Sequence, residues 1–149
     1  SFERYGIFWH LPNSSSAIDF IVGYGGNLED IHKPLGARAS FIPPNGAKLT
    51  EYTAEAVIDG RGVLQFNNSD FNIGHDQGDL LINNQTPSGL AILNAIENKI
   101  SFKLTLHNDG EVFARGTIDP SPIADRDFVY AEAKRLVESG DPRYCRSRP

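Results

Sequence analysis

Strict alternation of apolar and polar residues is the feature that most constrains the fold of this 149-residue chain. Its clearest example runs over residues 100–107, where every second residue is apolar: Ile100, Phe102, Leu104 and Leu106. This period is typical of a β-strand with one buried face. Asn-Asp-Gly follows at residues 108–110, which tolerates positive φ, and residues 111–118 then resume the pattern. The sequence therefore predicts a β-hairpin at this point.

Further segments repeat the pattern of strand, turn and strand. Residues 53–58 and 61–66 flank Asp59-Gly60, which predicts a hairpin with a two-residue type I′ turn. Residues 5–11 and 17–24 flank a loop of Pro, Asn and Ser, which predicts a third hairpin with a longer connection. Shorter strands are expected at 37–42 and 79–82. The chain is thus predicted to be mainly β, a single antiparallel sandwich or barrel of about eight strands.

Two segments have helical spacing instead. Ser88 is expected to cap a short helix whose Leu90, Leu93 and Ile96 share one face. Residues 125–138 are predicted to form a C-terminal amphipathic helix, ended by Gly140 and Pro142 and lying across one sheet face or an open barrel end. We expect a single β-rich domain over residues 1–142 and a basic, flexible tail over residues 143–149.

The charge of the chain bears on its partners. It has 14 basic and 19 acidic side chains, a net charge of −5. This balance argues against general affinity for nucleic acid. No apolar run reaches the roughly 18 to 20 residues that span a bilayer, so no membrane span is predicted. A protein or a small molecule is the expected partner.

A polar stretch at residues 67–79 holds the densest cluster of ionisable residues. It contains Asp70, His75, Asp76 and Asp79. These residues are candidates for ligand binding, and His75 beside carboxylates is a weak candidate for a general acid or base. An EF-hand match fails because β-branched Ile73 occupies the position where the calcium loop needs glycine. The histidines lack short zinc-ligand spacing, and neither a metal nor a cofactor is predicted.

Aromatic residues concentrate near the N-terminus, at Phe8 and Trp9. Because successive side chains of a strand point to opposite faces, these two cannot enter the same core. One of the two rings therefore lies on the face away from the core and needs another element packed over it. Either the C-terminal helix supplies that cover, or the aromatic ring is exposed and belongs to a binding surface.

The single cysteine, Cys145, has no partner for an internal disulfide. Its place among arginines predicts slow oxidation to a Cys145-linked dimer. The first residue is Ser1, and the chain contains no methionine. This suits a processed mature segment and slightly favours a periplasmic or extracellular location.

The final predicted hairpin followed by a helix, Ile100 to Val137, resembles small exported bacterial β domains such as the invasion-associated locus B group. The paired cysteines usual in that group are missing here, and no family is assigned. The leading hypothesis is a noncatalytic, exported or envelope-associated β domain that binds a protein or small ligand. One alternative is a hydrolase using His75 with the nearby aspartates, with or without a metal. The other is an inhibitor or immunity-type protein with an acidic binding surface.

Overall fold

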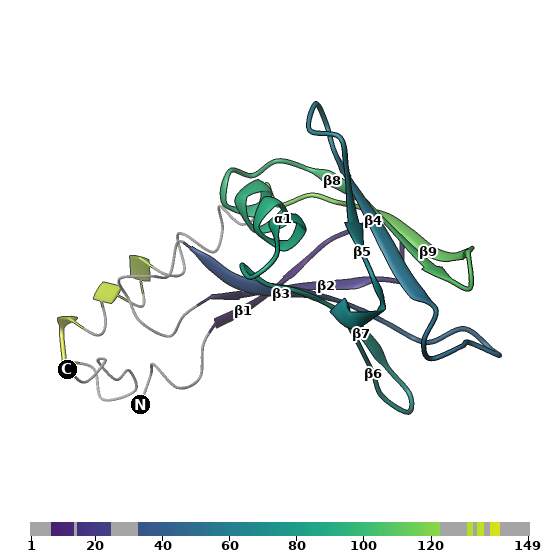
Figure 1. The fold of residues 1–149 in the computed structure, drawn as a ribbon. Coiled ribbons are helices and arrows are strands. Elements are labelled where there is room, and N and C mark those ends of the chain that lie inside the picture. The colour runs from purple at the N-terminus through teal and green to yellow at the C-terminus, as the bar shows by residue number, and fades with distance from the viewer. Residues whose placement is uncertain are drawn as a thin grey trace.

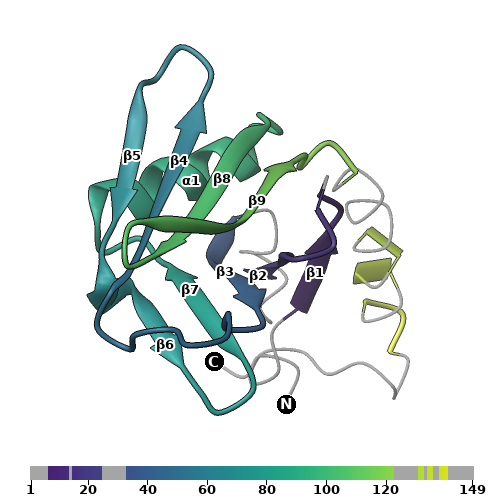
Figure 2. The same ribbon diagram turned by 90° about the vertical axis from the view of Figure 1, so that its right-hand side faces the viewer.

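The computed structural model describes residues 7–13, 15–24, 33–122, 131–132, 134–135 and 138–140. Within these residues nine strands form two antiparallel sheets, accompanied by the helix α1 (Figures 1 and 2). The first sheet contains, in spatial order, β1 (Ile7–Leu11), β2 (Asp19–Tyr24), β3 (Pro34–Phe41), β7 (Gly78–Ile82) and β6 (Phe71–Ile73). The second contains β5 (Val63–Phe66), β4 (Tyr52–Ile58), β8 (Phe102–Asn108) and β9 (Glu111–Ile118). The prediction of a mainly β, antiparallel and sandwich-like chain is confirmed.

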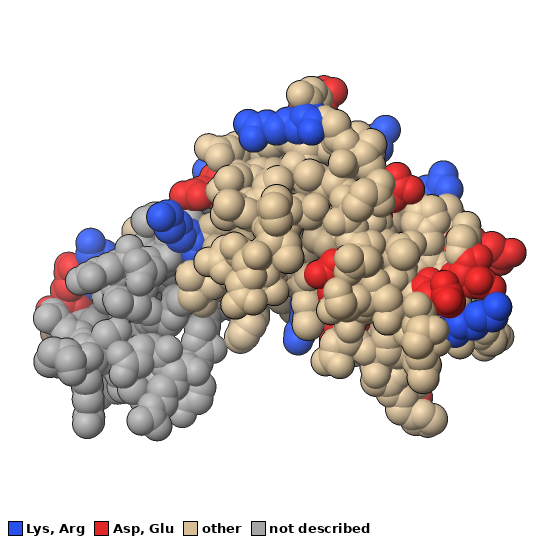
Figure 3. Space-filling view, in the orientation of Figure 1, with Lys and Arg blue, Asp and Glu red and all other residues tan. Residues whose placement is uncertain are grey.

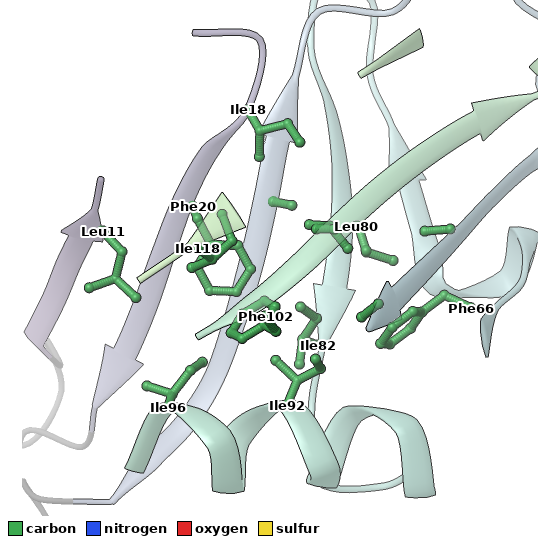
Figure 4. Close-up of a cluster of buried hydrophobic side chains, with 14 of the residues drawn as sticks. Leu11, Ile18, Phe20, Phe66, Leu80, Ile82, Ile92, Ile96, Phe102 and Ile118 are labelled. Carbon is green, nitrogen blue, oxygen red and sulfur yellow. The ribbon is translucent and has the colours of Figure 1, made fainter. Parts of the chain in front are cut away.

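The core lies between the two sheets and follows the alternation of the strands. The predicted buried face of β8 is correct, because Phe102, Leu104 and Leu106 are at most 2% exposed. Opposing side chains from the first sheet include Phe20 and Leu80, both fully buried. Figure 4 shows Phe20 and Leu80 of the first sheet converging with Phe102 of the second. The Phe20 and Phe102 rings meet edge to face, with centroids 5.5 Å apart, an arrangement that aromatic pairs favour.

Helix α1 (Pro87–Glu97) packs between the sheets, and Figure 4 shows its Ile92 and Ile96 pointing into the core. Its sequence-based description needs two corrections. The N-cap is Thr86, whose hydroxyl accepts a hydrogen bond from the Gly89 amide, rather than Ser88. Pro87 explains the difference, since proline suits the first helical position and Thr86 then takes the extended cap conformation. Leu90 was predicted on the buried face and is instead 45% exposed.

In the sequence, residues 67–79 stand out only as a polar stretch. In the structure they do not form a plain loop. A 3-10 turn at Asn68–Asp70 is followed at once by β6, which pairs antiparallel with β7. The short alternation of Phe71 and Ile73 around Asn72 forms this strand, because both apolar side chains pack against the core. The turn connects an edge strand of the second sheet to an edge strand of the first. A single bridge, Asn13 with Ile118, joins the sheets elsewhere.

The three predicted hairpins are present, as the antiparallel pairs β1–β2, β4–β5 and β8–β9. The turns of the last two differ from each other. Between β8 and β9, Asp109 and Gly110 both have positive φ, 53° and 80°, as a type I′ turn requires. Between β4 and β5, Asp59-Gly60 does not form such a turn. The last β4–β5 pair is Val57 with Val63, so five residues lie between the last paired residues instead of the two of a type I′ hairpin.

The register of the core explains this difference. A two-residue loop at Asp59-Gly60 would pair Ala54 with Gln65 and turn Phe66 to solvent, because a one-residue slip exchanges the two faces of a strand. The observed register pairs Ala54 with Phe66, and both side chains are buried. Burial of Phe66 therefore selects the longer connection.

Several predictions fall outside the described residues. The C-terminal helix at 125–138 lies mostly outside them and is not confirmed. Cys145 and the basic tail at 143–149 lie wholly outside them. Among the described residues, no helix is long and apolar enough to cross a membrane.

Candidate binding surface

Strand β1 places the two aromatic residues on opposite faces of the first sheet. Trp9 is half-buried and packs against the core, whereas Phe8 is 62% exposed on the outer face. The outer face is the side turned away from α1 in Figure 1. Phe8 lies opposite Gly23 of β2, and Gly23 lies opposite Gly36 of β3. The aromatic side chain is thus followed, strand by strand, by two residues without side chains.

The glycines leave a hollow on this outer face. A Cβ atom placed on Gly23 would lie 3.5 Å from the Phe8 ring, so the ring borders the empty position. The hollow has a volume of about 390 Å³, within the usual range for small-molecule sites. Two further apolar side chains on its rim are exposed, Leu35 by 56% and Leu81 by 41%. Its lining consists of Phe8, Ile21, Gly23, Tyr24, Leu35, Gly36, Ala37, Arg38 and Leu81.

Arg38 is the one charged residue in that lining. It lies on β3 between Ile21 of β2 and Leu81 of β7. Its guanidinium makes no hydrogen bond or ion pair within the part of the chain that the structure describes. The register places two carboxylates, Asp19 and Asp79, at diagonal positions. Each of them has another partner, so the positive charge of Arg38 faces the hollow without a carboxylate bound to it.

The neighbouring carboxylates form a polar row at one end of the face. Asp79 Oδ1 accepts hydrogen bonds from the Ser40 hydroxyl at 2.5 Å and from Gln77 Nε2 at 3.1 Å. Asp19 Oδ1 lies 3.0 Å from Nδ1 of His10. A second hollow of about 400 Å³ adjoins this row and includes Asp19, Ser40 and Asp76 in its lining. The outer face therefore changes from polar to apolar along the strands, with Arg38 at the boundary.

This polar row does not contain a serine–histidine pair. The Ser40 hydroxyl donates its hydrogen to Asp79, and His10 lies on β1, two strands away from Ser40 in the sheet. A serine is activated when a base accepts its proton within hydrogen-bond distance. In the described residues, no histidine accepts a hydrogen bond from a serine.

The residues predicted at 67–79 are separated in the structure. Asp70 Oδ2 accepts a hydrogen bond from the Asn67 amide at 3.0 Å and so holds the 3-10 turn, whereas Asp79 belongs to the polar row. His75 and Asp76 lie in the turn between β6 and β7, with side chains 99% and 93% exposed. Their nearest polar atoms are 3.9 Å apart. Among the described residues, no three His, Cys, Asp or Glu side chains group in a way that could hold a metal ion.

The outer face of the second sheet has a different character. His107 Nε2 lies 3.1 Å from Glu55 Oε1 across β8 and β4. Exposed Arg115 lies opposite Thr105 on the same face. Figure 3 shows acidic and basic side chains interspersed over the surface drawn there. Polar side chains of mixed charge are typical of a solvated sheet face, so the first sheet offers the stronger candidate site.

Of the residues that line the hollow, only Phe8 was a candidate from the sequence. A signal for two of them was present, because an isolated glycine within a strand pattern indicates a close approach of another group. Gly23 and Gly36 each occupy such a position. Their pairing with Phe8, and the position of Arg38 beside them, depend on the register of three strands.

Comparison of the chain with protein-family models, curated proteins and solved structures gives no match. The function must therefore be argued from the surface itself.

Proposed function

We propose that the chain is a noncatalytic binding domain whose outer face on β1, β2, β3 and β7 holds a small apolar ligand. The observation that carries the proposal is the hollow beside Phe8, whose floor is formed by two glycines. Exposed apolar side chains are normal when scattered. Here Phe8, Leu35 and Leu81 gather around one concave surface, and such clustering is typical of a binding site.

The other readings of the sequence receive less support from the geometry. A hydrolase built on His75 would need a carboxylate in hydrogen-bond contact with the imidazole, and the nearest one is 3.9 Å away in an exposed turn. An inhibitor with an acidic surface would need carboxylates gathered on one side, whereas the face drawn in Figure 3 carries both acidic and basic side chains. Export to the periplasm or the extracellular space stays a prediction.

A variant that fills the hollow tests the proposal without removing apolar surface. Gly23 has an extended backbone, and its missing Cβ would be in ordinary contact with Phe8. Gly23→Val should therefore fold, because β-branched residues suit strands. The uncharged fluorescent probe N-phenyl-1-naphthylamine should bind the parent protein. We expect Gly23→Val to weaken that binding at least tenfold, measured as fluorescence enhancement against probe concentration.

Thr105→Val is the matched control, because it adds the same side chain to the outer face of the other sheet. It should bind the probe like the parent, and melting curves should show that both variants are folded. If Gly23→Val binds as tightly as the parent, the hollow is not the site. If the parent does not bind the probe, the proposed function is wrong.

A further inference from the structure

We propose that the ligand of this hollow is a linear aliphatic monocarboxylate, bound with its carboxylate on Arg38 and its chain directed toward Phe8. This inference rests on the proposed function and adds the chemical class of the ligand. It comes from three features of the outer face: the single cation, the polarity on either side of it, and the distance to the aromatic ring.

Arg38 supplies the charge complementarity. A guanidinium presents paired N–H donors that match the two oxygens of a carboxylate. Ile21 and Leu81 flank Arg38 across the sheet, so its direct cross-strand neighbours are apolar. The nearby carboxylates of Asp19 and Asp79 have partners of their own, His10 for the first and Ser40 for the second. A ligand carboxylate would thus complete the pairing of Arg38.

The polarity of the face gives the ligand its direction and its single charge. On one side of Arg38 lie the carboxylates of the polar row, which repel a second anionic group. On the other side lie Gly23, Gly36 and the Phe8 ring, which offer contacts to hydrocarbon and no hydrogen-bond donors from side chains. The chain of the ligand must therefore extend toward Phe8, and its far end should be apolar.

The spacing of the strands gives the approximate length. Arg38 is on β3 and Phe8 is on β1, so two strand spacings separate them. At about 4.8 Å for each spacing, this is roughly 10 Å across the strands. Phe8 is level with Gly36, two residues along β3 from Arg38, which adds an offset of roughly 7 Å along the strands. The separation is thus roughly 12 Å, which an extended chain of about ten carbons covers. The two glycines form a floor without side chains, which suits an unbranched chain. Phe8 borders the far end.

The experiment compares three amphiphiles that share a ten-carbon chain and differ in charge: decanoate, decanol and decyltrimethylammonium. Their dissociation constants are measured by displacement of N-phenyl-1-naphthylamine, at low salt and below the concentrations at which they form micelles. We expect decanoate to bind the parent about five- to tenfold more tightly than decanol. The preference is modest because Arg38 is exposed and water screens its charge. It should decrease when salt is added.

Variants of Arg38 test whether this residue causes the preference for decanoate over decanol. Arg38→Gln should bind decanoate and decanol with equal affinity while its affinity for decanol stays that of the parent. Arg38→Lys keeps the charge without the planar pair of donors and should retain part of the preference. Arg115→Gln removes an exposed arginine from the other sheet and should change nothing. Melting temperatures of all three variants check that they are folded.

Different results would contradict the carboxylate assignment and the apolar binding site. If decanol and decanoate bind the parent equally, or if decyltrimethylammonium binds most tightly, the carboxylate assignment is wrong and the apolar site stands. If Arg38→Gln keeps the preference for decanoate, another cation is responsible and Arg38 is not the anchor. If none of the three amphiphiles displaces the probe, both proposals fail.

Discussion

Tyr52 shows how a single residue can pack well and still carry an unfavourable group. The side chain is fully buried, and its ring lies against those of Phe41, Phe71 and Phe113, with centroids 5.7, 5.4 and 5.9 Å away. Its hydroxyl has no hydrogen-bond partner among the described residues. A buried hydroxyl without a partner loses its bonds to water and gains none in return. The ring therefore stabilises the fold, while the hydroxyl opposes it.

Replacement of Tyr52 by phenylalanine should consequently leave the protein as stable as the parent or more stable, by up to about 1 kcal/mol. Urea unfolding measures this free energy. Tyr52→Leu is the contrasting variant, since it removes the ring contacts and should cost about 2 to 4 kcal/mol. A loss of more than about 1 kcal/mol in Tyr52→Phe would mean that the hydroxyl has a partner in solution.

The same hydroxyl gives a dependence on pH. Burial raises the pKa of Tyr52 above its ordinary value of 10.0, because the phenolate is poorly solvated in the core. The unfolded chain then releases this proton at lower pH than the folded one. The stability contributed by the neutral form is complete below pH 10, and it is lost as pH rises from there through the folded pKa. Tyr52→Phe should lack this alkaline component when melting temperatures are compared above pH 10.

Helix α1 shows, at the scale of an element, why a cap is difficult to locate by pattern alone. Thr86 and Ser88 are both residue types that cap helices, and they stand two positions apart. The proline between them decides the matter, because it fixes the backbone of the first helical residue. Thr86 thus lies outside the helix and accepts a hydrogen bond from Gly89, at 3.1 Å.

Thr86→Ala should destabilise the protein by about 1 kcal/mol, because the Gly89 amide loses its acceptor. Ser88→Ala is the matched control, and it should change the free energy of unfolding by less than about 0.5 kcal/mol. Denaturant unfolding of both variants measures the difference. Equal losses in the two variants would contradict the assignment of the cap.

Strand β6 shows that a short strand is also difficult to recognise from its sequence. Its three residues stand among turn-forming residues, so the apolar alternation of Phe71 and Ile73 is too short to stand out from a polar loop. Pairing with β7 and contact with the core make it a strand. The aspartates around it consequently go to different places, one into the 3-10 turn and another onto the outer face.

At the scale of the whole molecule, the two outer sheet faces have separate characters. The face of the second sheet carries mainly polar side chains of mixed charge, including the His107–Glu55 pair, together with the exposed Val57–Val63 pair beside the β4–β5 turn. The face of the first sheet carries the hollow, Arg38 and the polar row. If the outer face of the first sheet binds a ligand, the outer face of the second sheet can remain in contact with solvent.

The separation of the aspartates also predicts how the whole protein responds to cations. Calcium, magnesium or zinc should leave the melting temperature unchanged, because Asp70, Asp76 and Asp79 do not converge. A site bound at 100 times its dissociation constant would instead stabilise the fold by about 2.7 kcal/mol, which a thermal scan detects. A saturable rise that Asp76→Asn abolishes would overturn this prediction and favour a metal-assisted site.

The sequence by itself determined the longer strands, because alternation records which face of each strand is buried, and it determined that Phe8 and Trp9 must separate. Tertiary structure decided the connections and the surface. The β4–β5 turn was selected by the burial of Phe66 opposite Ala54, a contact that no local pattern encodes. The hollow needs Phe8, Gly23 and Arg38 from three different strands. Register brings such residues together, and register is fixed by the packing of the whole core.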